Sequence, residues 1–397
     1  MKKILKLFVF LTILQISVSG QTELVPNKIE LKNGKRFSLN LPKNYEVIPA
    51  AEGFSRVRFF AKAPDGRVFV TDMQSMSDNK KGVVYALGDW DEKVGQFGKI
   101  TRYLTGLRNP NSLAFYKDKS GQYWLYVAET HRLTRYRYSK NSNKPRGKAQ
   151  FIAGFPDRGR SYKYGSWHLT RTIAFSPNGK LYVSVGSSCN SCVEKEKTRA
   201  TVLEMDPNGR NSRRYVTGLR NAVGLKWIGE SLFATNEGVD HLGVEAPDDT
   251  LYKLKDGANY GWSFCYQAKG RITFDTKYTL PHLPPPDCSR VPKSYAYFPA
   301  HSSALGFEYF GENTADELFK NSFLVALHGS TDRDVGHGYK IAIVKTGGIH
   351  KDFLTGFVHN KTVFGRPCDI LKLNESSFLF TDDYSGVIYY VRKKSDT

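Results

Sequence analysis

A short unit that begins polar and turns apolar recurs six times along this chain. Each copy opens with a polar head residue, usually cationic, and continues into a short apolar strand. The head residues are Arg56, Asn109, His168, Arg220, His301 and Arg366. A turn and a second apolar strand follow each copy, as at Val68-Phe69-Val70 and Phe378-Leu379-Phe380. Successive copies lie roughly 50–80 residues apart, a spacing typical of radial or stacked repeat proteins.

The six units predict an all-β fold, a six-bladed β-propeller. Short alternating runs between Gly, Asn, Asp and Pro turns dominate the chain, and they indicate strands and hairpins. A two-sheet β-sandwich is the main alternative, but it does not explain six copies with the same start. The innermost strand of every propeller blade faces one common channel. We therefore expect the polar heads to converge, with the active site on one face of the central channel.

The 397 residues fall into four predicted segments. They are a signal peptide at 1–20, a lead-in at 21–44 with one possible strand over Arg36–Leu41, the propeller at 45–391 and a polar tail at 392–397. The first segment places lysines before an apolar run, as secretory signals do. That run is too short to cross a bilayer comfortably, so an uncleaved membrane anchor is the weaker alternative. We expect a secreted or periplasmic protein without stable membrane insertion after cleavage.

The formal net charge of +20 raises the question of an anionic partner. Basic proteins often bind nucleic acid, but export argues against that partner here. A solvated basic surface explains most of the charge. The Arg and His residues at the repeat heads also favour a cationic pocket for an anionic ligand, because the repeat itself sets their positions.

Five cysteines follow the predicted signal: Cys189, Cys192, Cys265, Cys288 and Cys368. Pairing is the default in an oxidising compartment. The Cys-Asn-Ser-Cys run could be a redox motif, a zinc half-site or a local disulfide, while Val193 excludes a haem attachment motif. We expect a loop disulfide between Cys189 and Cys192, and a second between Cys265 and Cys288. Cys368 is then left as a buried free thiol on an interior strand.

Several motifs in order resemble one family. They are His168, Ala174-Phe175-Ser176-Pro177-Asn178-Gly179, Gly218-Leu219-Arg220-Asn221, Gly257-Ala258-Asn259-Tyr260-Gly261-Trp262, Ala300-His301-Ser302-Ser303 and Gly365-Arg366-Pro367. Together they are similar to the soluble sugar dehydrogenases that use pyrroloquinoline quinone (PQQ), and most similar to the sorbosone dehydrogenase branch. Glucose and sorbosone dehydrogenases of this family are six-bladed propellers. The resemblance covers nearly the whole chain after the signal.

The resemblance implies that Arg220, Asn221 and Arg366 contact the cofactor. PQQ is a planar tricarboxylate, and arginine forks bind carboxylates bidentately without losing their charge. A surface ion pair is the plain alternative for any lone arginine. By the same resemblance His168 is the general base that removes a hydroxyl proton, for which an imidazole with a pKa near neutrality is suited. The alternative is a histidine of the channel wall, and for His301 substrate contact and wall lining are equal alternatives.

The family also uses calcium, held largely by backbone carbonyls, to polarise the quinone. The corresponding loop here is Glu237-Gly238-Val239-Asp240, so Gly238 and Val239 are the predicted carbonyl ligands. The family's cofactor-binding lysine has no clear match near His328–Arg333. The function implied is oxidation of a sugar, or a related polyol or aldose, by hydride transfer to PQQ, with an external electron acceptor. The alternatives are a metal-dependent propeller lactonase and a non-catalytic propeller that binds glycans or proteins.

Overall fold

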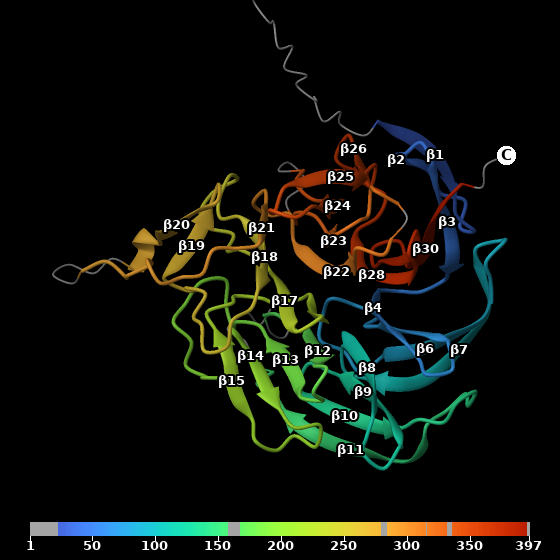
Figure 1. Cartoon of the computed structure of the whole chain (residues 1–397), viewed down its shortest axis with the longest axis horizontal. Coiled ribbons are helices and arrows are strands. Elements are labelled where there is room, and N and C mark those ends of the chain that lie inside the picture. The colour runs from blue at the N-terminus through green and yellow to red at the C-terminus, as the bar shows by residue number, and fades with distance from the viewer. Residues whose placement is uncertain (1–22, 158–166, 279–283, 315, 332–335, 395–397) are drawn as a thin grey trace, which may run out of the picture.

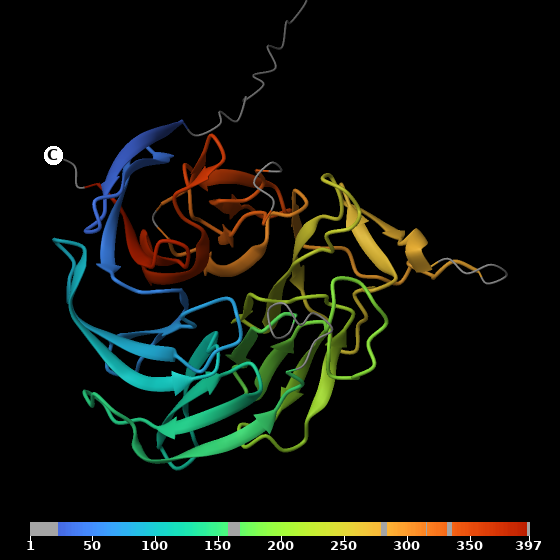
Figure 2. The same ribbon diagram turned by 180° about the vertical axis from the view of Figure 1, so that it is seen from behind.

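The computed structural model describes residues 23–157, 167–278, 284–314, 316–331 and 336–394. Six four-stranded antiparallel sheets radiate from a common axis, so the predicted six-bladed β-propeller is confirmed (Figures 1 and 2). From the inner strand outward, the first blade consists of β4 (Val57–Lys62), β5 (Val68–Asp72), β6 (Gly82–Asp91) and β7 (Gln96–Leu107). The second blade consists of β8 (Ser112–Lys117), β9 (Tyr123–Ala128), β10 (Arg132–Arg137) and β11 (Arg146–Gly154). The third blade consists of β12 (Arg171–Phe175), β13 (Leu181–Val185), β14 (Thr201–Met205) and β15 (Arg213–Thr217).

The other three blades follow the same inside-to-outside order. The fourth blade consists of β16 (Leu225–Ile228), β17 (Ser231–Asn236), β18 (Asp249–Lys253) and β21 (Ala296–Phe298). The fifth consists of β22 (Ala304–Phe310), β23 (Ser322–Leu327), β24 (Lys340–Val344) and β25 (His350–Leu354). The sixth consists of β28 (Pro367–Asn374), β29 (Ser377–Asp382), β30 (Val387–Lys393) and β3 (Tyr45–Glu52). The last blade therefore takes its outer strand from the start of the propeller. β30 runs to Lys393, so the first residues of the predicted polar tail belong to this blade.

Burial explains why the second strand of each blade is so apolar. All residues of β5, β13, β23 and β29 are buried, because neighbouring blades cover both faces of the sheet. The outermost strands β7 and β11 are largely exposed. Apolar clusters fill the spaces between blades, for example Phe233, Leu251, Phe307 and Val325 between the fourth and fifth. The core is thus a ring of layers between blades.

Smaller elements lie outside the six blades. The lead-in forms a hairpin of β1 (Leu24–Glu30) and β2 (Arg36–Pro42), of which only the second strand was expected. The fourth blade carries an excursion with β19 (Cys265–Ala268), β20 (Arg271–Phe274) and the 3₁₀ turn η1 (Thr276–Tyr278) (Figure 1). A short pair, β26 (Val358–His359) and β27 (Thr362–Val363), precedes the sixth blade. The predicted signal peptide lies outside the described residues, and within the described part no helix has the length and apolar character needed to cross a bilayer.

Both predicted disulfides are confirmed. Cys189 pairs with Cys192 in the loop after β13, and Cys265 pairs with Cys288 across the fourth-blade excursion. Cys368 is a buried free thiol on the inner strand β28, as expected. Cys189, Cys192 and Glu194 lie close enough to hold a metal ion, but the disulfide removes both thiolate ligands and with them the zinc interpretation.

Candidate functional site

The polar heads and the ends of the second strands meet at one face of the ring. Each head precedes an inner strand, and the antiparallel second strand of the same blade ends beside it. In four blades a side chain at that end accepts the backbone N–H of the head or of the residue next to it. These bonds join Asp72 to Arg56 (3.0 Å), Glu129 to Arg108 (2.7 Å), Asn236 to Asn221 (3.1 Å) and Asp382 to Arg366 (2.8 Å). In these four blades a polar side chain at the end of the second strand thus holds the backbone at or beside the head.

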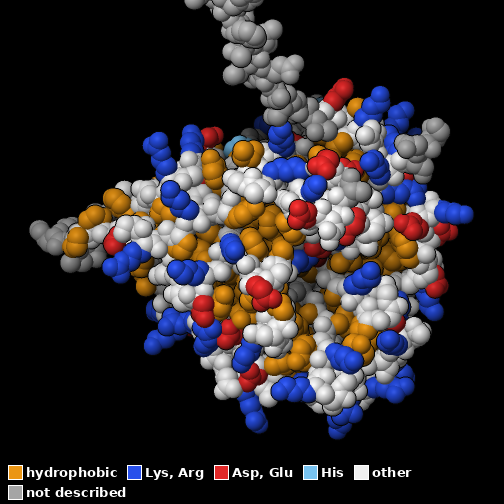
Figure 3. Space-filling view, in the orientation of Figure 1, with side chains coloured by type: hydrophobic (Ala, Val, Ile, Leu, Met, Phe, Trp, Pro, Cys, Tyr) orange, Lys and Arg blue, Asp and Glu red, His pale blue; other side chains and the backbone are white. Residues whose placement is uncertain are grey.

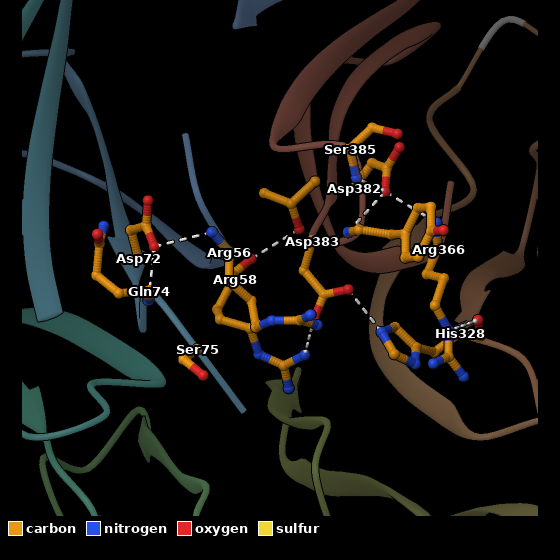
Figure 4. A network of polar contacts seen from close by, with 12 residues as sticks. Arg56, Arg58, Asp72, Gln74, Ser75, His328, Arg366, Asp382, Asp383 and Ser385 are labelled. Carbon is orange, nitrogen blue, oxygen red and sulfur yellow. Dashed lines mark hydrogen bonds and ion pairs between the residues drawn. The ribbon is translucent and has the colours of Figure 1, made fainter. Parts of the chain in front are cut away.

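Asp383, just after β29 in the sixth blade, binds two arginines from the first blade and a histidine from the fifth (Figure 4). Its carboxylate lies 2.7 Å from Arg58 Nη1, 3.3 Å from Arg56 Nη1 and 2.7 Å from His328 Nε2. Burial alone would raise the pKa of Asp383, but His328 and the two arginines hold it well below its usual range. Burial and the charge of Arg366 lower the pKa of His328 to about 4, so the neutral ring donates Nε2–H to Asp383.

Arg366 extends beside this cluster with its guanidinium bound by carbonyls. It donates from Nε to the His328 carbonyl at 3.1 Å and from Nη2 to the carbonyls of Gly329 and Ser330. The guanidinium also lies 5.4 Å from the centre of the Tyr339 ring. Its hydrogen bonds within the described residues go to neutral acceptors, so its charge remains available to an anionic ligand.

Arg220 and Asn221 stand at the head of the fourth blade. Arg220 donates to the carbonyl and the side-chain oxygen of Asn190, each at 2.9 Å, and lies 3.3 Å from the Asp240 carboxylate. Asn221 donates from Nδ2 to Glu237 at 2.5 Å. Arg220 is buried, whereas the side chain of Asp240 is 53% exposed, so solvent weakens this pair. The arginine is oriented mainly by Asn190.

His168, at the head of the third blade, is oriented by Ser187 at the end of the second strand. Its Nδ1 lies 2.9 Å from both the carbonyl and the hydroxyl oxygen of Ser187. The Ser187 hydroxyl donates its own hydrogen to the Cys189 carbonyl at 2.7 Å. Nδ1 must therefore carry the hydrogen, and Nε2 carries the free lone pair.

The electrostatic setting of His168 differs from the expectation. Burial and the charge of Arg220, with Arg171 and Arg199, lower the pKa of His168 well below its ordinary value instead of leaving it near neutrality. The imidazole is consequently neutral at neutral pH and able to accept a proton.

A glycine brings His168 and Asn221 together. A Cβ on Gly186 would lie 2.6 Å from Asn221 Oδ1 and 2.6 Å from His168 Cβ. No side chain fits at this position without displacing one of the two. The third-blade histidine and the fourth-blade amide therefore flank the same backbone, and the structure brings His168, Arg220 and Asn221 into one site.

His301 lies at the same face of the ring, where it contacts the loop after β17. Its Nε2 lies 2.8 Å from the Gly243 carbonyl and its Nδ1 lies 3.6 Å from Asp240. Asp240 is thus shared between His301 and Arg220. The structure places His301 against the loop of the fourth blade, at the rim of the candidate site.

The predicted calcium ligands lie in that loop. Gly238 donates its N–H to Asp249 at 2.7 Å, and Val239 is buried. The carbonyls of Gly238 and Val239 accept no hydrogen bond from the described residues. Burial and the nearby Glu237 raise the pKa of Asp249 to about 7. Free carbonyl oxygens beside two carboxyl groups suit a hard cation such as Ca²⁺.

Several residues of this site were missed by sequence reasoning. Arg58, Ser187 and Asp383 were not predicted as site residues, and Glu237 was placed in the calcium loop without a role of its own. A signal was present, because each second strand ends in a polar residue or is followed by one within two residues. These residues are Asp72, Glu129, Ser187, Glu237, His328 and Asp383. Arg333, beside His328 in sequence, lies outside the described residues.

Below the heads the inner strands enclose a cavity of about 270 Å³ on the axis. All inner strands contribute to its wall. Lys and Arg side chains are spread over the face seen in Figure 3, so the basic charge is largely a solvated surface. The clustered arginines of the candidate site are a separate feature, with Arg58 and Arg220 buried and Arg56 and Arg366 half-buried.

Comparison with known proteins identifies the family to which the chain belongs. The family model described as TrAA12-like matches residues 40–362. An uncharacterized protein of Borreliella burgdorferi is 30% identical over 226 residues, which cover 54% of this chain and 58% of that relative. The chain therefore matches well under two thirds of that relative's length.

Solved structures share the fold. The holo form of the pyranose dehydrogenase PQQ domain from Coprinopsis cinerea has a TM-score of 0.72 at 18% identity, covering 92% of this chain and 98% of that one. An iodide structure of Trichoderma reesei family AA12 has a TM-score of 0.72 at 16% identity, covering 96% and 100%. The PQQ-bound aldose sugar dehydrogenase of Streptomyces coelicolor has a TM-score of 0.60 at 18% identity, covering 89% and 100%. With the family match over most of its length, the chain belongs to the TrAA12-like family.

Proposed function

We propose that this protein is a PQQ-dependent sugar dehydrogenase that oxidises a hydroxyl group of a sugar or of a related polyol or aldose. The observation that carries the proposal is the meeting of a neutral, oriented histidine with buried arginines at one face of the channel. Family membership supports it, as do structural relatives described as a holo pyranose dehydrogenase PQQ domain and a PQQ-bound aldose sugar dehydrogenase.

The site chemistry fits a planar tricarboxylate. Arg366 and Arg220 present guanidinium groups whose strongest local partners are neutral oxygens, and Asn221 adds an amide. Arg58 is already neutralised by Asp383, so we assign it to positioning. The carbonyls of Gly238 and Val239 are the proposed calcium ligands, and a relative from Trichoderma reesei has a calcium structure. When bound, the quinone would accept hydride from the sugar carbon, and calcium would polarise it.

His168 is the proposed general base. Its Nδ1–H is anchored on Ser187, which leaves Nε2 to take the hydroxyl proton of the sugar. A depressed pKa keeps that nitrogen unprotonated at neutral pH. His301, tied to Asp240 and Gly243, is a proposed substrate contact at the rim. Electrons would leave to an external acceptor, and we expect the protein to act in a secreted or periplasmic setting.

The lactonase alternative has less support. Such a site requires carboxylate and amide ligands converging on one divalent ion. Within the described residues the only cluster of three potential ligands contains the disulfide cysteines. The non-catalytic alternative remains an outcome of the test below.

The test distinguishes the role of His168 as a general base from the role of Arg220 as a ligand of the cofactor. His168→Ala should bind PQQ but lose turnover by ~10²–10⁴, the typical contribution of a positioned general base. Arg220→Ala should weaken PQQ binding by roughly ten- to a hundredfold, because a hydrogen bond to a charged group is worth about 1.5–3 kcal/mol. Quinone titrations with calcium, followed by dye-reduction rates at saturation with a panel of sugars, measure the two effects.

The control is Arg213→Ala, which removes a half-exposed ion pair on the outer strand β15 and should alter neither quantity. A parent-like turnover of His168→Ala at saturation would reduce this residue to a wall histidine. A parent protein that binds no quinone would favour the non-catalytic propeller.

A further inference from the structure

The turn closed by the Cys189–Cys192 disulfide contacts two blades at once. It follows β13 in the third blade and begins two residues after Ser187. A four-residue ring of this kind restricts the backbone within it, whatever the mechanism of its stabilisation. Asn190 and Cys189, both inside the ring, offer their oxygen atoms to residues of the candidate site.

On one side the turn holds Arg220. Arg220 Nε donates to the Asn190 carbonyl and Nη2 donates to Asn190 Oδ1, each at 2.9 Å. Asn190 Oδ1 also accepts the backbone N–H of Asp240 at 3.0 Å. A single residue therefore fixes the guanidinium by a two-point contact and ties the calcium-ligand loop to it.

On the other side the turn orients His168. The Cys189 carbonyl accepts the Ser187 hydroxyl at 2.7 Å, which turns the lone pairs of that hydroxyl toward His168 Nδ1. The turn is itself braced from the fourth-blade excursion. Ser191 bonds to the Tyr278 hydroxyl at 2.8 Å, and the Ser191 carbonyl accepts Lys277 Nζ at 2.9 Å.

We propose that Asn190 is a positioning residue for Arg220, and that the Cys189–Cys192 disulfide holds one turn in the shape that orients both Arg220 and His168. The first half rests on the proposed function, since it takes Arg220 as a ligand of the anionic cofactor. The second half concerns the hydrogen-bonded state of His168 and holds with or without a ligand.

The experiment compares the parent with Asn190→Ala and with the double variant C189S/C192S. Asn190→Ala should weaken PQQ binding roughly tenfold, as expected for losing one hydrogen bond to a charged group, while His168 keeps its Nδ1–H form in ¹⁵N NMR of labelled histidine. C189S/C192S should weaken PQQ binding and also shift His168 toward a mixture of tautomers. Fluorescence titration with PQQ and NMR of the ligand-free protein give independent readouts.

The control is again Arg213→Ala, which removes a half-exposed ion pair on the outer strand β15 and no bond to Arg220, His168 or the turn. It should leave both readouts at parent values. Parent-like quinone affinity in Asn190→Ala and C189S/C192S would overturn the first half, and an unchanged His168 spectrum in C189S/C192S would overturn the second. Equal losses in Arg213→Ala would mean that the effects are not specific to the turn and would overturn both. If the parent binds no quinone, the proposed function and the first half fail, and the NMR comparison alone decides the second half.

Discussion

Three of the six heads adopt a backbone conformation that most residues avoid. The φ angles of Asn109, His168 and His301 are 43°, 47° and 63°, in the left-handed region. Such conformations cost about 1–3 kcal/mol for a residue other than glycine and persist only where the surroundings enforce them. At His168 the enforcing group is Arg171, whose guanidinium donates to the carbonyls of His168, Thr170 and Pro156, each at 2.7 Å. The Arg171 side chain therefore holds the backbone of His168 in this conformation by binding the carbonyls around it.

Asp249 gives a pH-dependent prediction at the residue scale. Burial raises its pKa to about 7 in the folded protein, against about 3.9 in an unfolded chain. Between these values the folded state holds more protons, so the contribution of Asp249 to stability falls as pH rises, by at most roughly 1.4 kcal/mol per pH unit. Urea unfolding at pH 5, 6 and 7 should show the parent losing stability relative to Asp249→Asn. Parallel pH profiles for the two proteins would contradict this assignment.

At the scale of elements, hydroxyl groups on second strands bind each blade to the next. Thr71, Thr235 and Thr381 donate to the carbonyls of Asn111, Leu305 and Arg58, which lie at the start of the following inner strand. The distances are 2.6, 2.7 and 2.7 Å. These bonds set how neighbouring heads sit relative to one another, and so they shape the site without touching it.

Thr235→Val tests this role with little change in volume. It leaves the Leu305 carbonyl and the Gly224 N–H, both buried, without their hydroxyl partner. Such losses cost about 1–3 kcal/mol each, so the urea midpoint should fall with an unchanged slope. The control is Thr105→Val, because Thr105 is exposed on the outer strand β7. Its free energy of unfolding should stay within about 0.5 kcal/mol of the parent value. Equal stability of both variants would show that the hydroxyl bridge contributes nothing.

The position of each site residue relative to the strands explains which of these residues the sequence could predict. The heads were found because each begins an apolar strand, and a strand's repeat position fixes where its first side chain lies. A recurring polar residue marks the positions of Ser187 and Asp383, but these two and Asn190 act through contacts between blades or within an irregular loop, which no local pattern encodes. The pKa of His168 was misjudged for the same reason, since it depends on burial in the assembled site and on Arg220 from another blade. The disulfides were predictable because export and spacing constrain them directly.

The whole molecule depends on closure of the ring. β3 joins the outer edge of the sixth blade by pairing with β30, with Val47 opposite Val391. The same blade carries Arg366 at its head and Asp383 after its second strand. Closure by a strand from the other end of the propeller removes a free sheet edge. It also couples the two ends of the chain to the geometry of the site.

Val47→Asp is the test of closure at this scale. Val47 is 2% exposed within the apolar cluster that includes Tyr389 and Val391, and a buried carboxylate without a partner is strongly destabilising. Because the pairing of β3 closes the ring, we expect a loss of about 3 kcal/mol or more and faster hydrogen exchange in both the first and the sixth blades. Val94→Asp, at a position 54% exposed, is the matched control and should resemble the parent. If hydrogen exchange in Val47→Asp rose only in β3, then the ring would hold without its closing strand, and the arginines of the site would not depend on it.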